Sequence, residues 1–467
     1  MQTSTDRGLG VITALAWICG TIALVMFWLA LLGIPWSLVT IGVGMGMSAL
    51  MGIALWRQFS QSRPLEPRPL AAKPLILDEK IIGIVLIVLT MAILFNGAYL
   101  PFPRADALAI YLPTAVMMAT TGALEPLIGA DSLYRTYPIL VQLNYTLAFL
   151  ISGWQNEMLA RTISTVLSLA CLPAAYLLGR ELGGRRVGLY AAFLLGCTPS
   201  FARFASSGYV DLPMAFFYTL TALYALRFWR TGQVAAAVPA GMMMGLAAFT
   251  KNAGLIGIPL LAVWFAAACW HPTLTPSARR QRLIGSGLSL VLCAAIAAPW
   301  YVRNLVGAGF IIPNTAWTDQ AERSLRTLAI FITLTENFAL TGWLVLGGLA
   351  LALFHLVRRV AGTEMDALIL WFSLPFFATW WVFVSYDPRF LLLFYPILCV
   401  GAGLLFDKIV RHWRVLATPL TIIFLLIATY CIWMAVEYKD DILQNPLMTL
   451  EQKMDILGRD FEIWVAE

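Results

Sequence analysis

Apolar residues occur along this chain in runs of about twenty, the length at which an α-helix crosses the hydrocarbon core of a membrane. A membrane β-barrel would instead alternate apolar and polar positions over about ten residues, and these runs do not alternate. The pattern therefore predicts an all-α polytopic membrane protein with about 13 transmembrane helices. The predicted spans are 9–33, 36–56, 81–100, 157–179, 186–201, 211–229, 233–250, 253–269, 284–300, 331–355, 366–384, 390–406 and 415–437.

The spacing of the runs divides the chain into four parts. Residues 1–60 are predicted to form an N-terminal transmembrane hairpin, and residues 61–80 a polar, proline-rich cytoplasmic linker. Residues 81–437 form the predicted transmembrane core, and residues 438–467 an amphipathic tail outside the cytoplasm. The first large loop of the core, residues 101–156, is expected on the outer face with a juxtamembrane helix.

That juxtamembrane helix is expected at residues 138–152, which are apolar but too short to cross and are interrupted by Gln142 and Asn144. If this segment crossed, every later loop would change sides and 13 basic residues of short loops would lie outside. We therefore expect a helix on the outer surface, with Pro138 at its start.

The tail carries a second helical pattern. Asn445 is expected to cap a helix with Pro446 at its first position. One apolar face then recurs at spacings of 4, 3, 4 and 3, formed by Leu450, Met454, Leu457, Phe461 and Trp464. We expect this face to pack on the outer surface of the bundle, the alternative being a frayed terminus.

Composition agrees with a membrane protein and restricts its chemistry. The chain is 60% hydrophobic and 12% charged, with a mean hydropathy of +0.80, whereas soluble proteins carry about 25% charged residues. The seven cysteines are scattered through apolar segments, and the three histidines each lie beside a basic loop, so neither a zinc site nor a His-based triad is predicted. There is no phosphate-binding glycine motif and no internal repeat, and we expect no nucleic-acid partner.

The distribution of Lys and Arg sets the predicted orientation. With the N-terminus in the cytoplasm, 19 of the 31 Lys and Arg residues lie in inside loops. This orientation puts the C-terminus outside, and we expect a multi-pass protein of a bacterial plasma (inner) membrane. The first apolar run is too long for a signal-peptide core and is expected to remain as an uncleaved anchor.

Two carboxylates at the ends of spans are the first candidates for chemistry. Asp106 lies in the polar loop after the span 81–100, and Asp211 opens the span 211–229. On the predicted topology both face outside, and ionisable groups near hydrocarbon usually mark a site. Each could instead cap the helix that it precedes or opens, and that alternative stays open.

Several short motifs, by their order and by the side of the membrane on which each is predicted to lie, make residues 81–410 resemble the GT-C glycosyltransferases. The nearest branch is the protein O-mannosyltransferase and aminoarabinose-transferase (ArnT-like) group. The motifs are Asp106 in the first outer loop, Arg161 near the start of a span, LGRELGGRR at 178–186, YVDLP at 209–213, GLAAFTKN at 245–252, PWYVRN at 299–304, and DPRFLL at 387–392 with Tyr395 and Pro396. The chain departs from the group at Ala107, where many members carry a second acid, and at YRTYP (134–138), where Arg135 stands in place of a lysine.

The resemblance implies an enzyme that transfers a sugar from a polyprenyl-phosphate-linked donor to a lipid, glycan or protein acceptor at the outer face of the membrane. Such a reaction needs a base for the acceptor hydroxyl and positive charge for the leaving phosphate. We expect Asp106 to be the base and Asp211 to act in catalysis or orient the substrate. The expected phosphate ligands are Lys251, Arg303, Arg389 and Arg135, and the expected groove residues are Tyr111, Tyr137, Tyr209, Asn252 and Tyr386.

No metal or other cofactor is required by these residues. A divalent metal ion stays an open alternative that no motif in the sequence supports. The cations have structural alternatives: Lys251 could snorkel to the interface, Arg303 could belong to an aromatic belt, and Arg389 could form a surface ion pair with Asp387. The alternative function is a transporter or flippase of lipid-linked saccharide, which would place ionisable residues near the membrane midplane. A non-catalytic scaffold would not need acids and cations gathered on one face.

Overall fold

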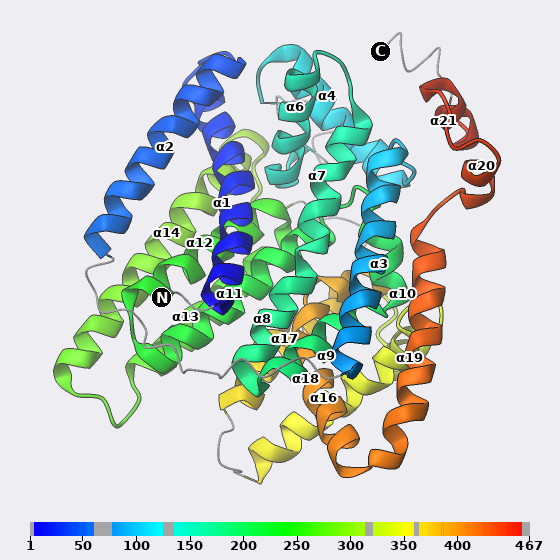
Figure 1. Cartoon of the computed structure of the whole chain (residues 1–467). Coiled ribbons are helices and arrows are strands. Elements are labelled where there is room, and N and C mark those ends of the chain that lie inside the picture. The colour runs from blue at the N-terminus through cyan, green and yellow to red at the C-terminus, as the bar shows by residue number, and fades with distance from the viewer. Residues whose placement is uncertain are drawn as a thin grey trace.

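The computed structural model describes residues 4–59, 77–124, 135–312, 321–358, 364–383, 385 and 387–459. Throughout these ranges the chain forms helices and no β-strand, which confirms the prediction of an all-α polytopic membrane protein (Figure 1). Among the described residues, eight helices are long and apolar enough to cross a membrane. Four shorter apolar helices accompany them.

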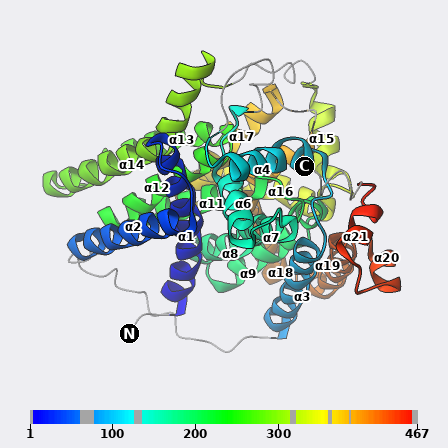
Figure 2. The same cartoon turned by 90° about the horizontal axis from the view of Figure 1, so that it is seen from above.

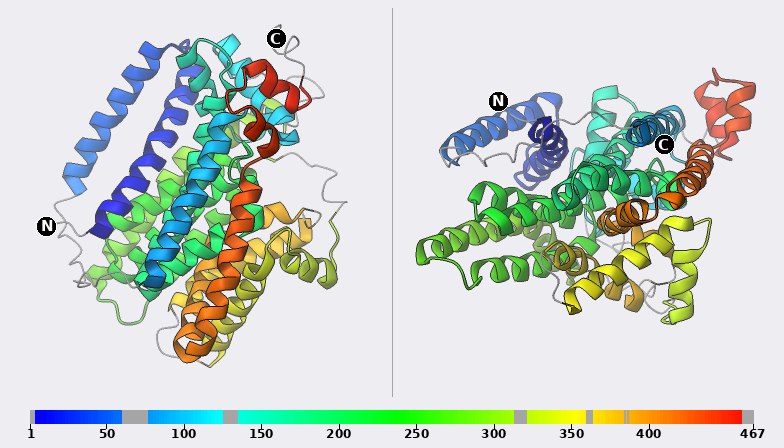
Figure 3. Two further views of the ribbon diagram at one scale, coloured as in Figure 1. Left: turned by 45° about the vertical axis from the view of Figure 1, so that its right-hand side comes forward. Right: turned by 60° about the horizontal axis from the view of Figure 1, so that its bottom comes forward.

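The N-terminal hairpin consists of α1 (Ser4–Leu31) and α2 (Leu38–Phe59), which lie side by side at one edge of the bundle (Figures 1 and 3). Hydrogen bonds join α1 to the core. The side-chain amide of Asn144 donates to the carbonyl of Cys19 over 3.1 Å. Most of the expected linker, 61–80, lies outside the described residues.

The first half of the core surrounds one central helix. Its elements are α3 (Leu77–Tyr99), the π-helical turn η1 (Ala107–Tyr111), α4 (Leu112–Thr121), α6 (Leu140–Ser152), α7 (Glu157–Leu169), α8 (Cys171–Gly183), α9 (Arg185–Gly196), α10 (Pro199–Phe204) and α11 (Asp211–Thr231). All side chains of α11 from Asp211 to Leu226 are buried, as expected for a helix that is apolar on every face.

The second half completes the bundle and ends in the tail. Its elements are α12 (Val234–Thr250), the 3₁₀ turn η2 (Asn252–Ile256), α13 (Gly257–Cys269), α14 (Pro276–Ala308), α15 (Leu325–Thr333), α16 (Ala339–Val357), α17 (Glu364–Phe383), the 3₁₀ turn η4 (Pro388–Leu393), α18 (Tyr395–His412), α19 (Arg414–Ala435), α20 (Lys439–Gln444) and α21 (Leu450–Ile456). Seen from above, α2 and α14 lie at one edge of the bundle and α20 and α21 at the opposite edge (Figure 2).

Two predicted spans are interrupted near prolines. The span 186–201 is wrong as a single helix, because α9 ends at Gly196 and α10 begins at Pro199. Proline has no N–H to continue the helical ladder, and the residue before it, Thr198, is extended. The span 390–406 starts too early, since η4 occupies its first residues.

The predicted span 331–355 also begins too early. Helix α15 ends at Thr333, and α16 begins only at Ala339. Between them the chain turns around the carbonyl of Leu334, which accepts the backbone N–H groups of Asn337, Phe338 and Ala339. Apolar residues stand on both sides of this turn, so the hydrophobic pattern alone did not reveal it.

A helix is present at the expected residues, as α6, but it is more buried than we expected of an interfacial helix. It packs against α1, α4 and α7, and residues from Leu140 to Thr146 are buried. Gln142 and Asn144, which interrupted the apolar run, are 1% and 2% exposed. Apolar residues that looked suited to the membrane interface are therefore covered by other helices.

The tail packs on the bundle as expected, but its helix begins at a different residue. The cap is Thr449, not Asn445, because Thr449 and Gln452 form a reciprocal capping box. Met454 of the predicted apolar face is fully buried, while Phe461 and Trp464 lie outside the described residues.

Candidate active site

Two ion pairs bring together four of the charged residues singled out from the sequence. A guanidinium nitrogen of Arg389 lies 2.8 Å from Asp106 Oδ2, and Lys251 Nζ lies 2.6 Å from Asp211 Oδ1. The ring of Phe390 joins the pairs, since Lys251 Nζ is 4.4 Å and the Arg389 guanidinium 4.8 Å from its centroid. The pairs connect the loop before η1, the start of α11, the turn after α12 and the turn η4.

Arg389 is the centre of the first pair. It also lies 3.4 Å from Asp387 Oδ2 and stacks over the ring of Tyr209 at 4.6 Å. Burial lowers the pKa of Arg389, but the carboxylates of Asp211, Asp387 and Asp106 outweigh burial and raise it overall. Arg389 therefore stays charged. Its ion pair with Asp387 is partly buried within the site and is not a pair between two exposed surface groups.

Asp106 is the more accessible carboxylate of the two pairs. Its side chain is 35% exposed, against 2% for Asp211. It stands at the N-cap position of η1 without making a side-chain capping hydrogen bond. Its backbone N–H donates to the hydroxyl of Tyr209 over 3.3 Å. The carboxylate is thus held by Arg389 and not by a capping role.

Asp211 and Lys251 form the buried pair. Asp211 Oδ2 is buried and has no hydrogen-bond partner among the described residues. Lys251 lies between α12 and η2, where Gly254 packs so closely on Ala247 that a Cβ would come within 2.6 Å of its backbone. Burial lowers the pKa of Lys251, and Asp211 opposes that shift. The snorkelling alternative for Lys251 does not hold, because its ammonium group points to a buried acid.

Tyrosines line this cluster. Tyr111 and Tyr209 meet edge to face, with ring centroids 6.2 Å apart. Burial raises the pKa of Tyr111 well above its usual value, and the nearby charge of Asp211 raises it further. Tyr137 also lies within electrostatic reach of Tyr111. Burial and Asp106 likewise raise the pKa of Tyr209.

The remaining predicted site residues have other positions. The side-chain oxygen of Asn252 lies 3.3 Å from the hydroxyl of Tyr301, so it supports α14. Tyr386 lies outside the described residues. Arg135 directly precedes Thr136 in the chain, and Arg303 lies at the end of α14 that holds Thr136.

Thr136 is held by the end of α14. Its carbonyl accepts from Trp300 Nε1 over 3.2 Å and from Asn304 Nδ2 over 2.9 Å. Arg303, between these two donors in sequence, stacks over the buried Trp300 ring at 4.6 Å. Arg135 and Tyr137 flank Thr136 in the chain, and Tyr137 interacts electrostatically with Tyr111. Arg135 thus belongs to this segment, and Arg303 belongs to the helix end on which the segment is docked.

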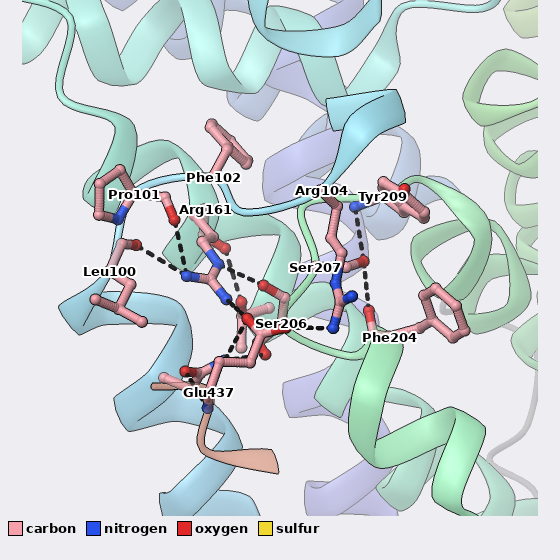
Figure 4. Close-up of polar contacts among 12 residues, drawn as sticks. Leu100, Pro101, Phe102, Arg104, Arg161, Phe204, Ser206, Ser207, Tyr209 and Glu437 are labelled. Carbon is pink, nitrogen blue, oxygen red and sulfur yellow. Dashed lines mark hydrogen bonds and ion pairs between the residues drawn. The ribbon is translucent and has the colours of Figure 1, made fainter. Parts of the chain in front are cut away.

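Arg161 was named as a motif residue, but the buried network that it forms was not predicted from the sequence (Figure 4). Arg161 is fully buried and donates to the carbonyls of Leu100 and Pro101, over 3.0 and 2.9 Å, and to that of Ser206. It also pairs with Glu437 over 3.0 Å. Arg161 was visible as a charge within a predicted span, which is a signal for a buried partner.

This network fixes the two segments that carry the acids. Leu100 and Pro101 precede the loop of Asp106, and Ser206 precedes the loop of Asp211. Gly208, with φ +82°, lets that second loop approach Phe102, whose ring would lie 2.3 Å from a Cβ. Only glycine combines this backbone conformation with this contact.

Each acid of the site forms an ion pair with a cationic side chain. Among the described residues, no group of three His, Cys, Asp or Glu side chains is placed to hold a metal ion. Asp106, Asp211 and Asp387 are each paired with Lys251 or Arg389 instead.

Comparison with known sequences gives one partial match. Residues 136–301 match the model of a family described as dolichyl-phosphate-mannose-protein mannosyltransferase. This range contains Asp211 and Lys251 but neither Asp106 nor Arg389. No curated protein matches the chain.

Comparison with solved structures identifies the fold. ArnT from Cupriavidus metallidurans in the apo state is 18% identical, with a TM-score of 0.54 over 72% of this chain and 61% of ArnT. ArnT bound to undecaprenyl phosphate is 16% identical, with a TM-score of 0.56 over 76% and 69%. The archaeal oligosaccharyltransferase AglB from Archaeoglobus fulgidus, in complex with an inhibitory peptide and a dolichol-phosphate, is 15% identical, with a TM-score of 0.50 over 77% and 56%.

The chain thus spans 61% of the length of apo ArnT. Eight long apolar helices, the partial family match and the likeness to ArnT agree with one another. The resemblance inferred from the sequence motifs is confirmed for the fold: the chain has the fold of the GT-C glycosyltransferases, in the form found in ArnT.

Proposed function

We propose that this chain is an integral-membrane glycosyltransferase that moves a sugar from a polyprenyl-phosphate-linked donor to an acceptor at the outer face of a bacterial inner membrane. The observation that carries the proposal is the accessible Asp106 carboxylate, fixed by Arg389 beside the buried Asp211–Lys251 pair. The fold likeness supports it, because the ArnT and AglB structures hold undecaprenyl phosphate and a dolichol-phosphate.

Asp106 is the proposed general base. Arg389 binds its Oδ2, which leaves Oδ1 to take the proton of the acceptor hydroxyl. The acceptor oxygen forms a bond to the anomeric carbon, and the bond from that carbon to the phosphate oxygen breaks. The polyprenyl phosphate leaves with the electron pair, so this single displacement inverts the anomeric configuration. Asp106 then returns its proton to solvent, to which its side chain is 35% exposed.

Asp211 is proposed to orient the sugar. Its Oδ1 is neutralised by Lys251, while its buried Oδ2 has no partner among the described residues. A buried acceptor without a partner is costly, and a sugar hydroxyl could supply the missing hydrogen bond. This role differs from that of Asp106, since Asp211 is too enclosed to exchange a proton with bulk water.

The phosphate ligands divide into two groups. Arg389 and Lys251 form ion pairs with the carboxylates of the cluster and are proposed to add positive charge beside the leaving phosphate. Arg135, in the segment docked on α14, and Arg303, on α14 itself, are proposed to bind the phosphate oxygens, because a guanidinium can bind them with two parallel hydrogen bonds.

The proposed function is tested with purified protein and polyprenyl-phosphate sugars. We expect release of polyprenyl phosphate together with a new glycosidic bond of inverted configuration. A flippase, the alternative function, would move the donor across a bilayer with its sugar–phosphate bond intact. Intact donor with every sugar and acceptor supplied, in the presence or absence of divalent metal ions, would reject the transferase.

The arginines at Thr136 give a specific expectation. Arg303→Ala and Arg135→Ala should each raise the donor Kd about tenfold or more, since a hydrogen bond to a charged group is worth about 1.5–3 kcal/mol. Arg303→Lys should restore little of the affinity if the contact is bidentate. Equilibrium binding of a polyprenyl-phosphate sugar measures this effect, and unchanged affinity in both alanine variants would reject the assignment.

The proposed orientation can be tested in intact cells. The seven native cysteines are buried, so the thiol background is low. A cysteine at exposed Glu451 in the tail should react with an impermeant thiol reagent, because the positive-inside rule places the tail outside. A cysteine at exposed Ser277, in the first turn of α14, should react only after permeabilisation. The reverse pattern would overturn the topology.

A further inference from the structure

The tail that follows α19 contacts the loop that carries Asp106. Helices α20 and α21 lie beside the upper end of α3 in two views (Figures 1 and 3). Ile442 and Met448 form a small buried cluster with Leu100, and the hydroxyl of Tyr99 donates to the carbonyl of Pro446 over 2.9 Å. The tail is therefore docked on Leu100, the residue at which the loop of Asp106 begins.

Arg459 makes the most specific contact of the tail. Its two terminal nitrogens lie 2.7 and 2.8 Å from the two carboxylate oxygens of Glu157, a bidentate pair. The Glu157 side chain is 1% exposed and that of Arg459 is 18% exposed. A bidentate pair with one buried partner has a fixed geometry, unlike a pair between two mobile surface groups.

The same pair holds the backbone of the Asp106 loop. Glu157 Oε2 accepts the backbone N–H of Phe102 over 3.1 Å, and Arg459 donates to the carbonyl of Phe102 over 3.4 Å. The ring of Phe102 is fully buried, between Tyr145 and the close approach at Gly208. Both polar groups of this residue are thus bound by one ion pair, four residues before Asp106.

We propose that Arg459 is a positioning residue for the transfer reaction, which acts through Glu157 and Phe102 to hold Asp106 in place. The expected effect of Arg459 on the rate of sugar transfer rests on the proposed function of Asp106. Arg161 fixes the loop from below through Leu100 and Pro101, and Arg459 fixes it from the tail side. The tail thus acts on the active site through the loop that carries Asp106.

The first test measures the loop without using activity. Hydrogen–deuterium exchange of peptides covering residues 100–108 should be faster in Arg459→Ala than in the unmodified protein, with exchange in α11 unchanged. Lys453→Ala is the matched control, because this residue of α21 lies over the Tyr99 ring at 3.9 Å and is not part of the Arg459–Glu157 pair. Exchange of the loop that is the same in Arg459→Ala and in the unmodified protein would overturn the inference.

The second test measures transfer. Arg459→Ala should lower kcat by about 10-fold to 100-fold with little change in the KM for the donor, since a displacement of about 1 Å can cost about 10² in rate. Arg459→Lys should rescue poorly because it cannot form the bidentate pair. Arg459→Ala should have no further effect in an Asp106→Asn background, whereas general destabilisation would lower the rate by the same factor in both backgrounds and would overturn the inference.

The two tests separate this inference from the proposed function. If the unmodified protein transfers no sugar from any donor, the proposed function fails, and the exchange experiment still decides whether Arg459 holds the loop. If transfer is observed but Arg459→Ala retains its full kcat, the positioning role is rejected while the proposed function stands.

Discussion

Asp106→Asn should abolish most sugar transfer while leaving the protein folded. Loss of a general base typically lowers a rate about 10²–10⁴-fold, and asparagine cannot take a proton at neutral pH. The side chain is 35% exposed and makes no capping hydrogen bond, so little stability should be lost. Steady-state kcat with a polyprenyl-phosphate sugar, together with donor binding and the melting temperature in detergent, measures the separation.

Asp387→Asn is the matched control for this experiment. Asp387 is the other accessible carboxylate on Arg389, 32% exposed, and its side chain accepts the backbone N–H of Arg389 over 2.8 Å. Asparagine can accept the same hydrogen bond, so this variant removes one negative charge near Arg389 without removing the proposed base. Equal losses of rate in the two variants would indicate a shared electrostatic effect and would reject Asp106 as the base.

Lys251→Met should cause the largest loss of stability among the site variants. It would leave the carboxylate of Asp211, 2% exposed, buried without its cation. Removing one partner of a buried ion pair costs about 3–5 kcal/mol, and we expect the lower end because Lys251 retains some exposure. The melting temperature and the fraction of monodisperse protein in detergent measure the loss.

The double variant Lys251→Met with Asp211→Asn identifies the cause. Removing the charge of Asp211 as well should recover part of the lost stability, because no buried carboxylate would then lack a partner. Lys453→Met, which removes a lysine that stacks over Tyr99, should cost much less. A stable Lys251→Met protein with weakened donor binding alone would instead support the phosphate contact first predicted for Lys251.

The hydrophobic pattern was sufficient to predict the class of the fold. Long apolar runs form helices in water-free surroundings whatever their neighbours are, because every backbone group must be bonded within the segment. The same local reasoning located Asp106 and Asp211 at helix ends. It could not identify the turn around Leu334, where the chain satisfies its backbone within a short apolar segment.

The pattern could not show which apolar faces meet lipid and which meet protein. Helix α6 was expected on the outer surface and is buried against α1, α4 and α7. Lipid tails are as apolar as a leucine side chain, so the two environments select the same residues. Burial in a membrane protein is therefore decided by helix packing.

The sequence by itself determined that acids and cations stand at the ends of apolar helices, because a charge within hydrocarbon is too costly without a partner. Only the tertiary structure decided how they pair. Arg389 meets Asp106 across 283 positions of the sequence, and Arg459 meets Glu157 across 302. Such contacts depend on the packing of whole helices, so the positions of the site residues were predictable from local sequence and their partners were not.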